Sequence, residues 1–240
     1  MTQTASKPAP KCPGPVACEN CDLYELCCAL DGFAKGWLPG AQTRATLRSL
    51  APGAVLYREG MPLRGIYAVR KGIVKALRTD PSGEKHTVAF HVPGEVLGLD
   101  GFSTRQCTAD VIAVTPTIVC ELPVSLLMTS GPAAERLRVP LQRLLSQPAA
   151  SAAVRQGRST KRRLRAFLCE LADRLREHGF APSDVYFDTT RREFAEVLGA
   201  HVDSLRSAIE ELECEGELQF EARRFRIPSA GSVAGRSSAR

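Results

Sequence analysis

From about residue 45 to residue 122 the sequence consists of short runs that alternate apolar with polar or small residues, separated by glycines. Such runs, repeated about every 8–12 residues, are typical of antiparallel sandwiches and barrels. The tetrapeptide DPSG at 80–83 has the composition of a tight turn. The stretch therefore predicts an antiparallel β-domain, whose strands we expect in AVLYREG, GIYAVRKG, GIVKALRTD, HTVAFHVPG, ADVIAV and TIVCELP.

Beyond Pro123 the apolar residues take a helical spacing instead. We expect two helical pieces rather than one rod, because Pro140, Pro148 and Gly157 interrupt the region. The first piece places Leu137, Leu141, Leu144 and Leu145 on one face, and the second does so with Leu164, Phe167, Leu168, Leu171 and Leu175.

Residues 186–227 predict a helix-turn-helix followed by a small hairpin, or wing. Thr190 and Glu193 have the capping-box spacing at the start of RREFAEVL, and Gly199 suits the left-handed position after that helix. The short turn GAH then leads to VDSLRSAIEELECEG, and ELQFEARRFRIP follows. Two short helices joined by a glycine-containing turn are the helix-turn-helix pattern, although other helical corners also produce it.

Cysteines are crowded near the N-terminus, where CENCDLYELCC at 18–28 holds four of the nine. The Pro-rich residues 1–17 are expected to be extended or disordered, and they lack the apolar region of a secretory signal. No segment approaches the roughly 18 apolar residues of a membrane span, so we expect a cytoplasmic protein. In a reducing compartment, clustered cysteines indicate metal ligands or redox groups rather than disulfides.

The net charge of +6 permits a nucleic-acid partner without requiring one. Six positive charges lie in RQGRSTKRRLR at 155–165, and a solvated surface explains them as well as a contact with phosphates does. Neither a Ser-His-Asp set nor a Walker-type motif is recognisable, so we expect no enzyme.

The order of these parts resembles the Crp/Fnr family of transcription regulators, and within it the branch of the oxygen-responsive fumarate-and-nitrate-reduction regulator, FNR. The resemblance runs from about Cys18 to Pro228 and is carried by CENCDLYELC, GIYAVRKGIVKA, HVPGEVLGLDGF, IVCELP and TRREFAEVLG. CENCDLYELC and IVCELP are the specific stretches, since they match the C-x2-C-x5-C cluster of the branch and its single distant cysteine.

The resemblance implies an α+β fold with an N-terminal antiparallel β-roll of the cyclic-nucleotide-binding type, a connecting dimerisation helix and a C-terminal winged helix-turn-helix. The expected divisions are a cysteine-rich segment at 1–30, a sensor domain at 31–127, a dimerisation region at 128–178 and a DNA-binding domain at 179–240.

The resemblance also implies that Cys18, Cys21, Cys27 and Cys120 hold a [4Fe–4S] cluster, one cysteine to each iron. In the branch, oxygen converts the cube to a smaller cluster, which disfavours the DNA-binding dimer. Cluster loss would release the tie between a mobile segment and the sensor domain. A structural zinc site and unligated reactive thiols are the alternatives, and Cys28 is an alternative third ligand.

Gly94 and Glu95 match a pair that the cyclic-AMP branch follows with an Arg-Ser that grips phosphate. Here Arg105 has no serine beside it, and Cys107, Thr108 and Ala109 stand at the expected place. An anion pocket without its charge-assisted partner is weak, so no cyclic nucleotide is expected.

In the branch, the Glu and Arg of Glu-x-x-Ser-Arg read base edges, and the matching stretch here is DSLRS at 203–207. Asp203 takes the Glu position, whereas Arg206 and Ser207 are transposed, which turns the side chain by about 100° around the helix. The TTGAT half-site of the branch therefore does not carry over directly. The expected DNA contacts are Arg191, Arg192, Asp203, Ser204, Arg206 and Ser207, with Arg223, Arg224 and Arg226 also near the DNA backbone and the glutamates of 208–217 facing away.

The partners implied by the resemblance are promoter DNA, RNA polymerase and a second copy of the chain. An apolar helix face needs a partner that buries it, so Leu137, Leu141 and Leu144 are predicted to form the homodimer seam, which Pro148 would kink or weaken. We expect an oxygen- or redox-responsive transcription regulator. The alternative is a metal- or thiol-based redox sensor of the same fold with altered or lost DNA recognition.

Overall fold

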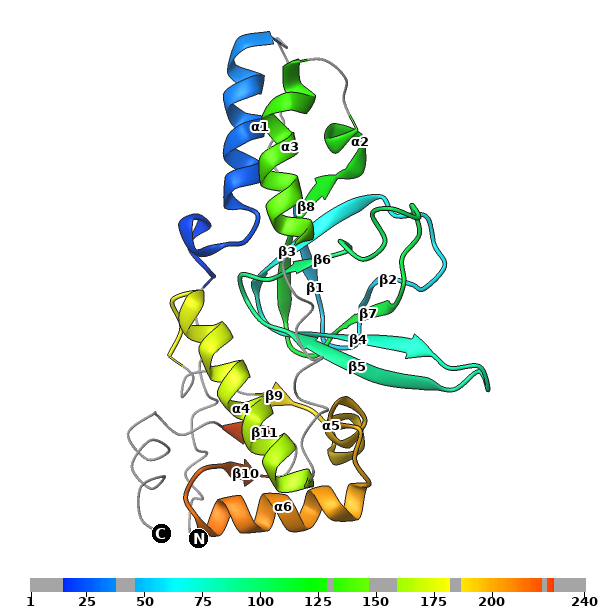
Figure 1. The fold of residues 1–240 in the computed structure, drawn as a ribbon, viewed down its shortest axis with the longest axis vertical. Coiled ribbons are helices and arrows are strands. Elements are labelled where there is room, and N and C mark those ends of the chain that lie inside the picture. The colour runs from blue at the N-terminus through cyan, green and yellow to red at the C-terminus, as the bar shows by residue number, and fades with distance from the viewer. Residues whose placement is uncertain are drawn as a thin grey trace, which may run out of the picture.

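The computed structural model describes residues 15–37, 46–128, 132–146, 159–181, 187–221 and 224–226 (Figure 1). Three parts follow one another along the long axis of Figure 1: a helical pair, a β-roll and a C-terminal helical unit with a small sheet. The elements are η1 (Cys18–Asn20), α1 (Tyr24–Trp37), β1 (Thr46–Leu50), β2 (Val55–Tyr57), β3 (Gly65–Lys71), β4 (Val74–Thr79), β5 (Lys85–His91), β6 (Val96–Leu97), β7 (Asp110–Ala113), β8 (Thr117–Pro123), α2 (Val124–Leu127), α3 (Pro132–Leu145), α4 (Thr160–Glu177), β9 (Phe187–Asp188), α5 (Arg191–Leu198), α6 (Val202–Cys214), β10 (Gln219–Glu221) and β11 (Arg224–Arg226).

Two four-stranded antiparallel sheets form the β-roll, with strand orders β1-β8-β3-β6 and β2-β7-β4-β5. Side chains alternate between the faces of a strand, and β3 shows this clearly. Tyr67 and Val69 enter the core between the sheets, whereas Ile66 and Ala68 face the helices outside. The predicted β-domain is confirmed, and all six expected runs contain a strand.

The outer face of β3 and β8 is covered by α1 and α3, which lie side by side in Figure 1. Leu23, Leu26 and Leu30 pack there with Leu137 and Leu144 of α3. The prediction that the α3 leucines form a homodimer seam is therefore wrong for this structure. Leu137 and Leu144 are buried inside their own chain, and Leu141 is partly buried against the same cluster.

The C-terminal unit is a winged helix-turn-helix, as predicted. Thr190 and Glu193 form the reciprocal capping box, and Gly199 ends α5 in the left-handed conformation with φ 59°. A three-stranded sheet of order β10-β11-β9 completes the unit. One core joins α4, α5 and α6 with Ile73, Phe90 and Val92 of the β-roll, so the two parts share buried surface.

Several details differ from expectation. The cysteine-rich segment is helical after Leu23, because Leu23, Leu26 and Leu30 give it an apolar face that packs on the β-roll. Helix α3 runs through Pro140 instead of stopping there. Cys12, Pro148, Gly157 and Arg223 lie outside the described residues. In the described part of the chain, no helix is long and apolar enough to cross a membrane.

Candidate functional site

The cysteine segment, residues 18–22, is attached to the β-roll at both ends by backbone hydrogen bonds. The amide of Val16, just before it, donates to the carbonyl of Arg70 on β3 at 2.8 Å. The amide of Asp22 donates to the carbonyl of Gly94 at 3.0 Å. Between these points the chain makes the single 3₁₀ turn of η1. The β-roll therefore holds the cysteine segment in place.

Cys21 lies near Cys18 and Cys120, although Cys120 is far away in the sequence. Burial raises the pKa of Cys21 to about 11, and the charges of Cys120, Asp22 and Cys18 add to that effect. At neutral pH the Cys21 side chain is therefore a thiol. A metal bound there would have to displace its proton, as it does at any thiolate site.

Arg70 lies between two of the predicted ligands. Its guanidinium donates to Cys18 Sγ at 3.2 Å, and the side chains of Cys18 and Cys120 both raise the pKa of Arg70. The register explains this position, because Ala68 of β3 is paired with Cys120 of β8. Arg70 lies two residues beyond Ala68, at the point where the register of β3 and β8 shifts between Val69 and Lys71. A fixed positive charge thus faces the space between Cys18 and Cys120.

Cys27 and Cys28 have different surroundings. Both lie in the first turns of α1. Cys27 is partly buried against the same apolar cluster as Cys21 and Cys120. Cys28 is exposed, and it hydrogen-bonds the hydroxyl of Tyr24. The helix thus turns Cys27 towards the other predicted ligands and Cys28 towards solvent.

This donor set fits an iron–sulfur cluster chemically. Cysteine thiolates are the usual ligands of such clusters. Within the described ranges, no three His, Cys, Asp or Glu side chains gather round one position for a single metal ion. A [4Fe–4S] cluster does not need that arrangement, because each of four cysteines approaches a different iron. Cys18, Cys21, Cys27 and Cys120 would hold it.

Glu95, which the sequence aligns with a nucleotide-contacting position, is buried and fully engaged. Arg174 of α4 donates to its two carboxylate oxygens at 2.6 and 2.7 Å, and His91 Nδ1 lies 3.3 Å from Oε2. Burial alone raises the pKa of Glu95, but the charge of Arg174 and the hydrogen bonds from His91 and Arg174 outweigh it, which lowers the pKa to about 2. The carboxylate therefore stays ionised and paired.

The predicted reading face lies at the N-terminal end of α6. Asp203, Ser204, Arg206 and Ser207 are all exposed, while Leu205 packs inward. Arg206 lies 3.7 Å from Asp203, and the Ser207 hydroxyl donates to the Asp203 carbonyl at 3.3 Å. On α5, Arg191 and Arg192 are exposed, and Arg192 pairs with Glu196 at 3.2 Å. These side chains are all accessible from solvent.

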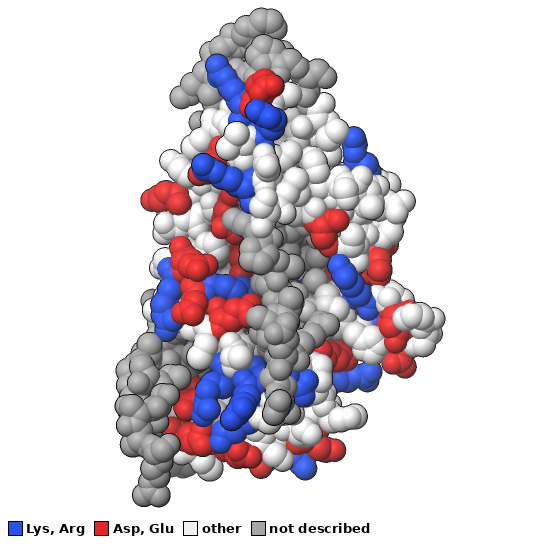
Figure 2. Space-filling model, viewed as in Figure 1, with Lys and Arg blue, Asp and Glu red and all other residues white. Residues whose placement is uncertain are grey.

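Three glutamates of the acidic run pair with α4 inside the chain. Lys161 contacts Glu211 and Glu215, each at 2.8 Å. Arg165 contacts Glu215 at 2.9 Å and Glu217 at 2.7 Å. Figure 2 shows the result as basic and acidic atoms side by side over α4 and α6. The basic run at 155–165 is thus partly used in structural ion pairs, because Lys161 and Arg165 belong to it.

The sequence reasoning did not identify Arg70, Arg174 or His178 as site residues. Arg70 was inside a stretch that carried the resemblance, and strand periodicity relative to Cys120 was the only signal for its role. His178 Nδ1 lies 2.8 Å from the carbonyl oxygen of Asn20 in the cysteine segment. No spacing rule relates residues so far apart in the sequence.

Comparisons with known proteins agree with this architecture. Residues 47–129 match the cyclic nucleotide-binding domain family. The chain is 27% identical over 214 residues to the transcriptional activator protein Anr of Pseudomonas aeruginosa, covering 88% of each chain. It is 25% identical over 194 residues to the fumarate and nitrate reduction regulatory protein of Vibrio cholerae, covering 79% of this chain and 78% of that one.

Solved structures share the fold. FixK2 from Bradyrhizobium japonicum superposes with a TM-score of 0.60 at 24% identity, over 77% of this chain and 93% of that one. A CRP-family transcriptional regulator from Thermus thermophilus superposes with a TM-score of 0.57 at 20% identity, over 75% and 91%. The chain is thus similar to the Anr and fumarate-and-nitrate-reduction regulators over most of its length, contains a cyclic nucleotide-binding domain and shares the fold of CRP-type regulators.

Proposed function

We propose that the chain is an oxygen- or redox-responsive transcription regulator in which Cys18, Cys21, Cys27 and Cys120 hold a [4Fe–4S] cluster. The observation that carries the proposal is the position of Cys120. It comes from β8, yet it packs in the same cluster as Cys21 and Cys27, and Arg70, which donates to Cys18, lies near it. The names of the Anr and fumarate-and-nitrate-reduction relatives support the same function.

The residues of this chain supply the frame for the cluster. Backbone bonds at Val16 and Asp22 fix the cysteine segment, and Arg70 places a positive charge beside two thiols. Such a charge stabilises thiolates and the net negative charge of a ligated cluster. When bound, the cluster would supply iron and sulfide that react with oxygen. Cys28 stays outside the proposed ligand set, because Cys27 and not Cys28 packs in the cluster that contains Cys21 and Cys120.

The DNA-binding proposal rests on α5 and α6. The matched proteins are named as a transcriptional activator and a transcriptional regulator, so we propose that this chain binds promoter DNA as a dimer and is a regulator rather than an enzyme. We place the N-terminal end of α6 in the major groove, as in other helix-turn-helix proteins. Asp203, Ser204, Arg206 and Ser207 then approach base edges, and Arg191 and Arg192 approach phosphates. A second copy of the chain and RNA polymerase complete the assembly, in the cytoplasm, without a cyclic nucleotide.

One observation favours the alternative, a redox sensor with altered or lost DNA recognition. Arg206 has Asp203 3.7 Å away, and both are exposed. An Arg that reads guanine must present its guanidinium to the base, and the pair competes with that contact. The transposed order of Arg206 and Ser207 points the same way.

Anaerobic purification with visible absorbance and iron and sulfide analysis tests the cluster. We expect a brown protein with about four irons and four sulfides per chain, from the Cys₄ ligation of such clusters. Replacing Cys18, Cys21, Cys27 or Cys120 with Ser removes the absorbance. The matched control is Cys28→Ser, next to Cys27 on the same helix, which keeps it. A colourless protein with stoichiometric zinc, or loss of the cluster in Cys28→Ser but not in Cys27→Ser, contradicts the assignment.

A further inference from the structure

The C-terminal end of α4 touches the cysteine segment directly. His178, which follows α4, has Nδ1 2.8 Å from the carbonyl oxygen of Asn20 and Nε2 3.9 Å from Asp22 Oδ2. Asn20 lies between Cys18 and Cys21 in the sequence. Figure 1 shows this end of α4 beside η1. His178, just after α4, therefore contacts the backbone of the segment that carries Cys18 and Cys21.

His178 also fits closely against the backbone of Gly94. A Cβ atom at Gly94 would lie 2.2 Å from the His178 ring, where no side chain fits, and Gly94 has φ 105°. The same Gly94 accepts the hydrogen bond from the Asp22 amide at 3.0 Å. His178 is 7% exposed, so the ring fills the space between Gly94 and the cysteine segment.

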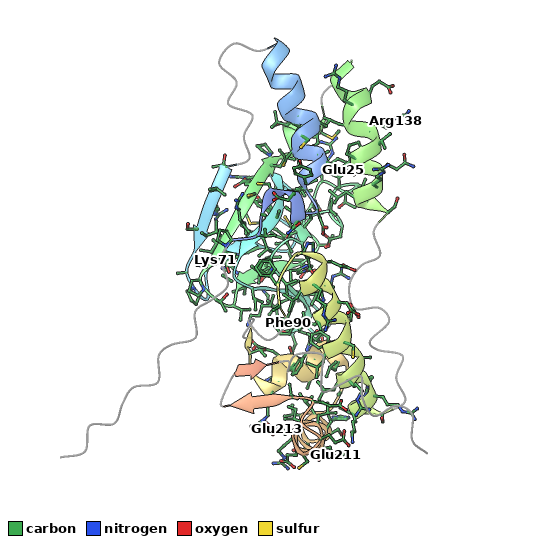
Figure 3. All side chains as sticks on the ribbon, turned by 90° about the vertical axis from the view of Figure 1, so that its left-hand side faces the viewer. Glu25, Lys71, Phe90, Arg138, Glu211 and Glu213 are labelled. Carbon is green, nitrogen blue, oxygen red and sulfur yellow. The ribbon has the colours of Figure 1, made fainter. Side chains whose placement is uncertain are left out.

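One helical turn earlier, Arg174 binds the neighbour of Gly94. Its guanidinium donates to both oxygens of Glu95 and to the carbonyl of Phe90 at 2.8 Å. Phe90, labelled in Figure 3 at the junction of the β-roll and α4, is buried in the core that α4, α5 and α6 share. Glu95 thus holds α4 through a paired charge, and its two oxygens are occupied by the protein itself.

Helix α4 in turn holds α6. The ion pairs of Lys161 and Arg165 with Glu211, Glu215 and Glu217 join the N-terminal end of α4 to the C-terminal end of α6 and the residues just after it. Buried apolar residues of both helices pack in one core. A displacement at the C-terminal end of α4 is therefore transmitted to α6 through a packed element, which is the kind of physical path that coupling between sites requires.

We propose that His178 and Arg174, seated on Gly94 and Glu95, form a latch through which α4 responds to the conformation of the cysteine segment. The latch fixes α4, α5 and α6 on the β-roll while Asn20 and Asp22 keep their positions, and it loosens when the segment rearranges. This inference rests on the proposed function for the natural trigger, which is a change at Cys18 and Cys21. In this proposal the turn at Gly94 and Glu95, which resembles a nucleotide site, binds helix α4 of the same chain.

Amide hydrogen exchange of peptides from α4 tests the latch in the full-length chain. We compare anaerobic cluster-loaded protein with the same protein after air exposure. Exchange in α4 should become about three- to tenfold faster in wild type, as expected when a hydrogen bond that protects a local unit is lost. In His178→Ala the exchange should already be fast and should no longer respond. An unchanged α4 in wild type, or a full response in His178→Ala, overturns the proposal.

A second pair of variants separates loss of the latch from general misfolding. Gly94→Ala forces a methyl group into the His178 ring and should reproduce the uncoupled exchange of His178→Ala. Gly83→Ala is the matched control, because Gly83 has a similar φ of 87° and nothing within 4 Å of the added Cβ. It carries the backbone strain without the clash, so α4 should behave as in wild type. Equal behaviour of the two glycine variants contradicts the latch.

Iron and sulfide analysis of the same samples shows whether a cluster is bound. It thereby separates failure of the cluster proposal from failure of the latch. If no cluster binds, alkylation of the thiols with iodoacetamide replaces air exposure as the change at the segment. Wild type should then show faster α4 exchange after alkylation, whereas a Cys18→Ser, Cys21→Ser chain should not. If the two chains respond alike, the cysteine segment is not what α4 senses, and the latch is refuted independently of the cofactor.

Discussion

Arg174 and Glu95 form a buried, two-bond ion pair between helix α4 and the β-roll, with N–O distances of 2.6 and 2.7 Å. The residues are separated by 79 positions in the sequence. Both side chains are close to fully buried, at 13% and 10% exposure. A buried ion pair of this kind adds little net stability. Removing one partner is nevertheless costly, because it leaves an uncompensated buried charge.

We therefore expect Arg174→Met to lower the free energy of unfolding by about 3–5 kcal/mol. The double change Arg174→Met with Glu95→Leu should recover most of that loss, since no charge then remains buried. Urea unfolding followed by circular dichroism measures both. The control is Arg176→Met on the same helix, whose exposed side chain pairs with nearby Asp173, and the effect should stay within about 0.5 kcal/mol. If Arg174→Met costs no more than Arg176→Met, the pair has no structural role.

The same pair makes stability depend on pH in the acid range. The pKa of Glu95 is about 2 in the fold, against an ordinary value of about 4.3. The unfolded chain therefore binds more protons, and the stabilisation is complete above the ordinary value and is lost as the pH falls towards 2. A shift of this size corresponds to about 3 kcal/mol.

We expect the stability difference between wild type and Glu95→Gln to shrink steadily between about pH 4.3 and 2. Urea midpoints at a series of pH values measure it. Comparison with Glu95→Gln isolates this carboxyl from Glu193 and Asp80, whose pKa values are also lowered to about 2. A difference that stays constant over this range would show that Glu95 is not ionised in the fold.

Helix α3 provides a test of which leucines belong to the monomer. Leu137 is 3% exposed and packs against α1, whereas Val139 on the same helix is 49% exposed. Leu137→Ala should lower the free energy of unfolding by about 2–5 kcal/mol, while Val139→Ala should change it by no more than about 0.5 kcal/mol. Thermal unfolding at two protein concentrations measures both. If the loss of stability in Leu137→Ala disappears on dilution, Leu137 contributes to a dimer seam instead.

The sequence predicted those elements whose signals are local. The strand runs between residues 54 and 123 alternate with the period of a sheet, and Thr190 and Glu193 specify a helix start through neighbouring atoms. Strands β1 and β6 are not among the six expected runs. Strand β6 has only two residues, Val96 and Leu97, which lie in HVPGEVLGLDGF, a stretch quoted for the family resemblance. Helix α1 was not predicted, because the cysteines of this segment indicate metal or redox chemistry and carry no helical signal of their own.

Partners of a buried surface were not predictable in the same way. The apolar stripe of Leu137, Leu141 and Leu144 indicates that something must cover it, but periodicity does not say whether that is a second chain or α1. Likewise, the sequence relates Glu95 only to a nucleotide-binding pair, and no local signal assigns a role to Arg174. Their pairing depends on how α4 docks, which only the three-dimensional arrangement shows. The candidate ligands came from a resemblance, and Arg70 came from the register of β3 and β8.

The DNA-reading face of α6 gives the last prediction. Arg206 is exposed near the helix N-terminus, so Arg206→Ala should cost about 1–3 kcal/mol at one base position and relax specificity there. Arg192→Ala should weaken binding to all sequences alike and flatten the salt dependence, since it removes a phosphate contact. The double change Arg206→Ser with Ser207→Arg restores the residue order of the FNR branch and should shift preference towards its half-site.

Selection from a random DNA pool by anaerobic, cluster-loaded protein measures all three changes, and salt titration of the enriched sequence separates Arg206 from Arg192. Arg138→Ala is the control, because Arg138 is an equally exposed arginine of α3, at the opposite end of the molecule from α6 in Figure 3. It should leave both sequence preference and salt slope unchanged. If cluster-loaded wild type enriches no sequence, α6 does not read DNA directly. The Asp203–Arg206 pair then marks a recognition helix that has lost its reading contacts, and the redox-sensor alternative describes the protein better.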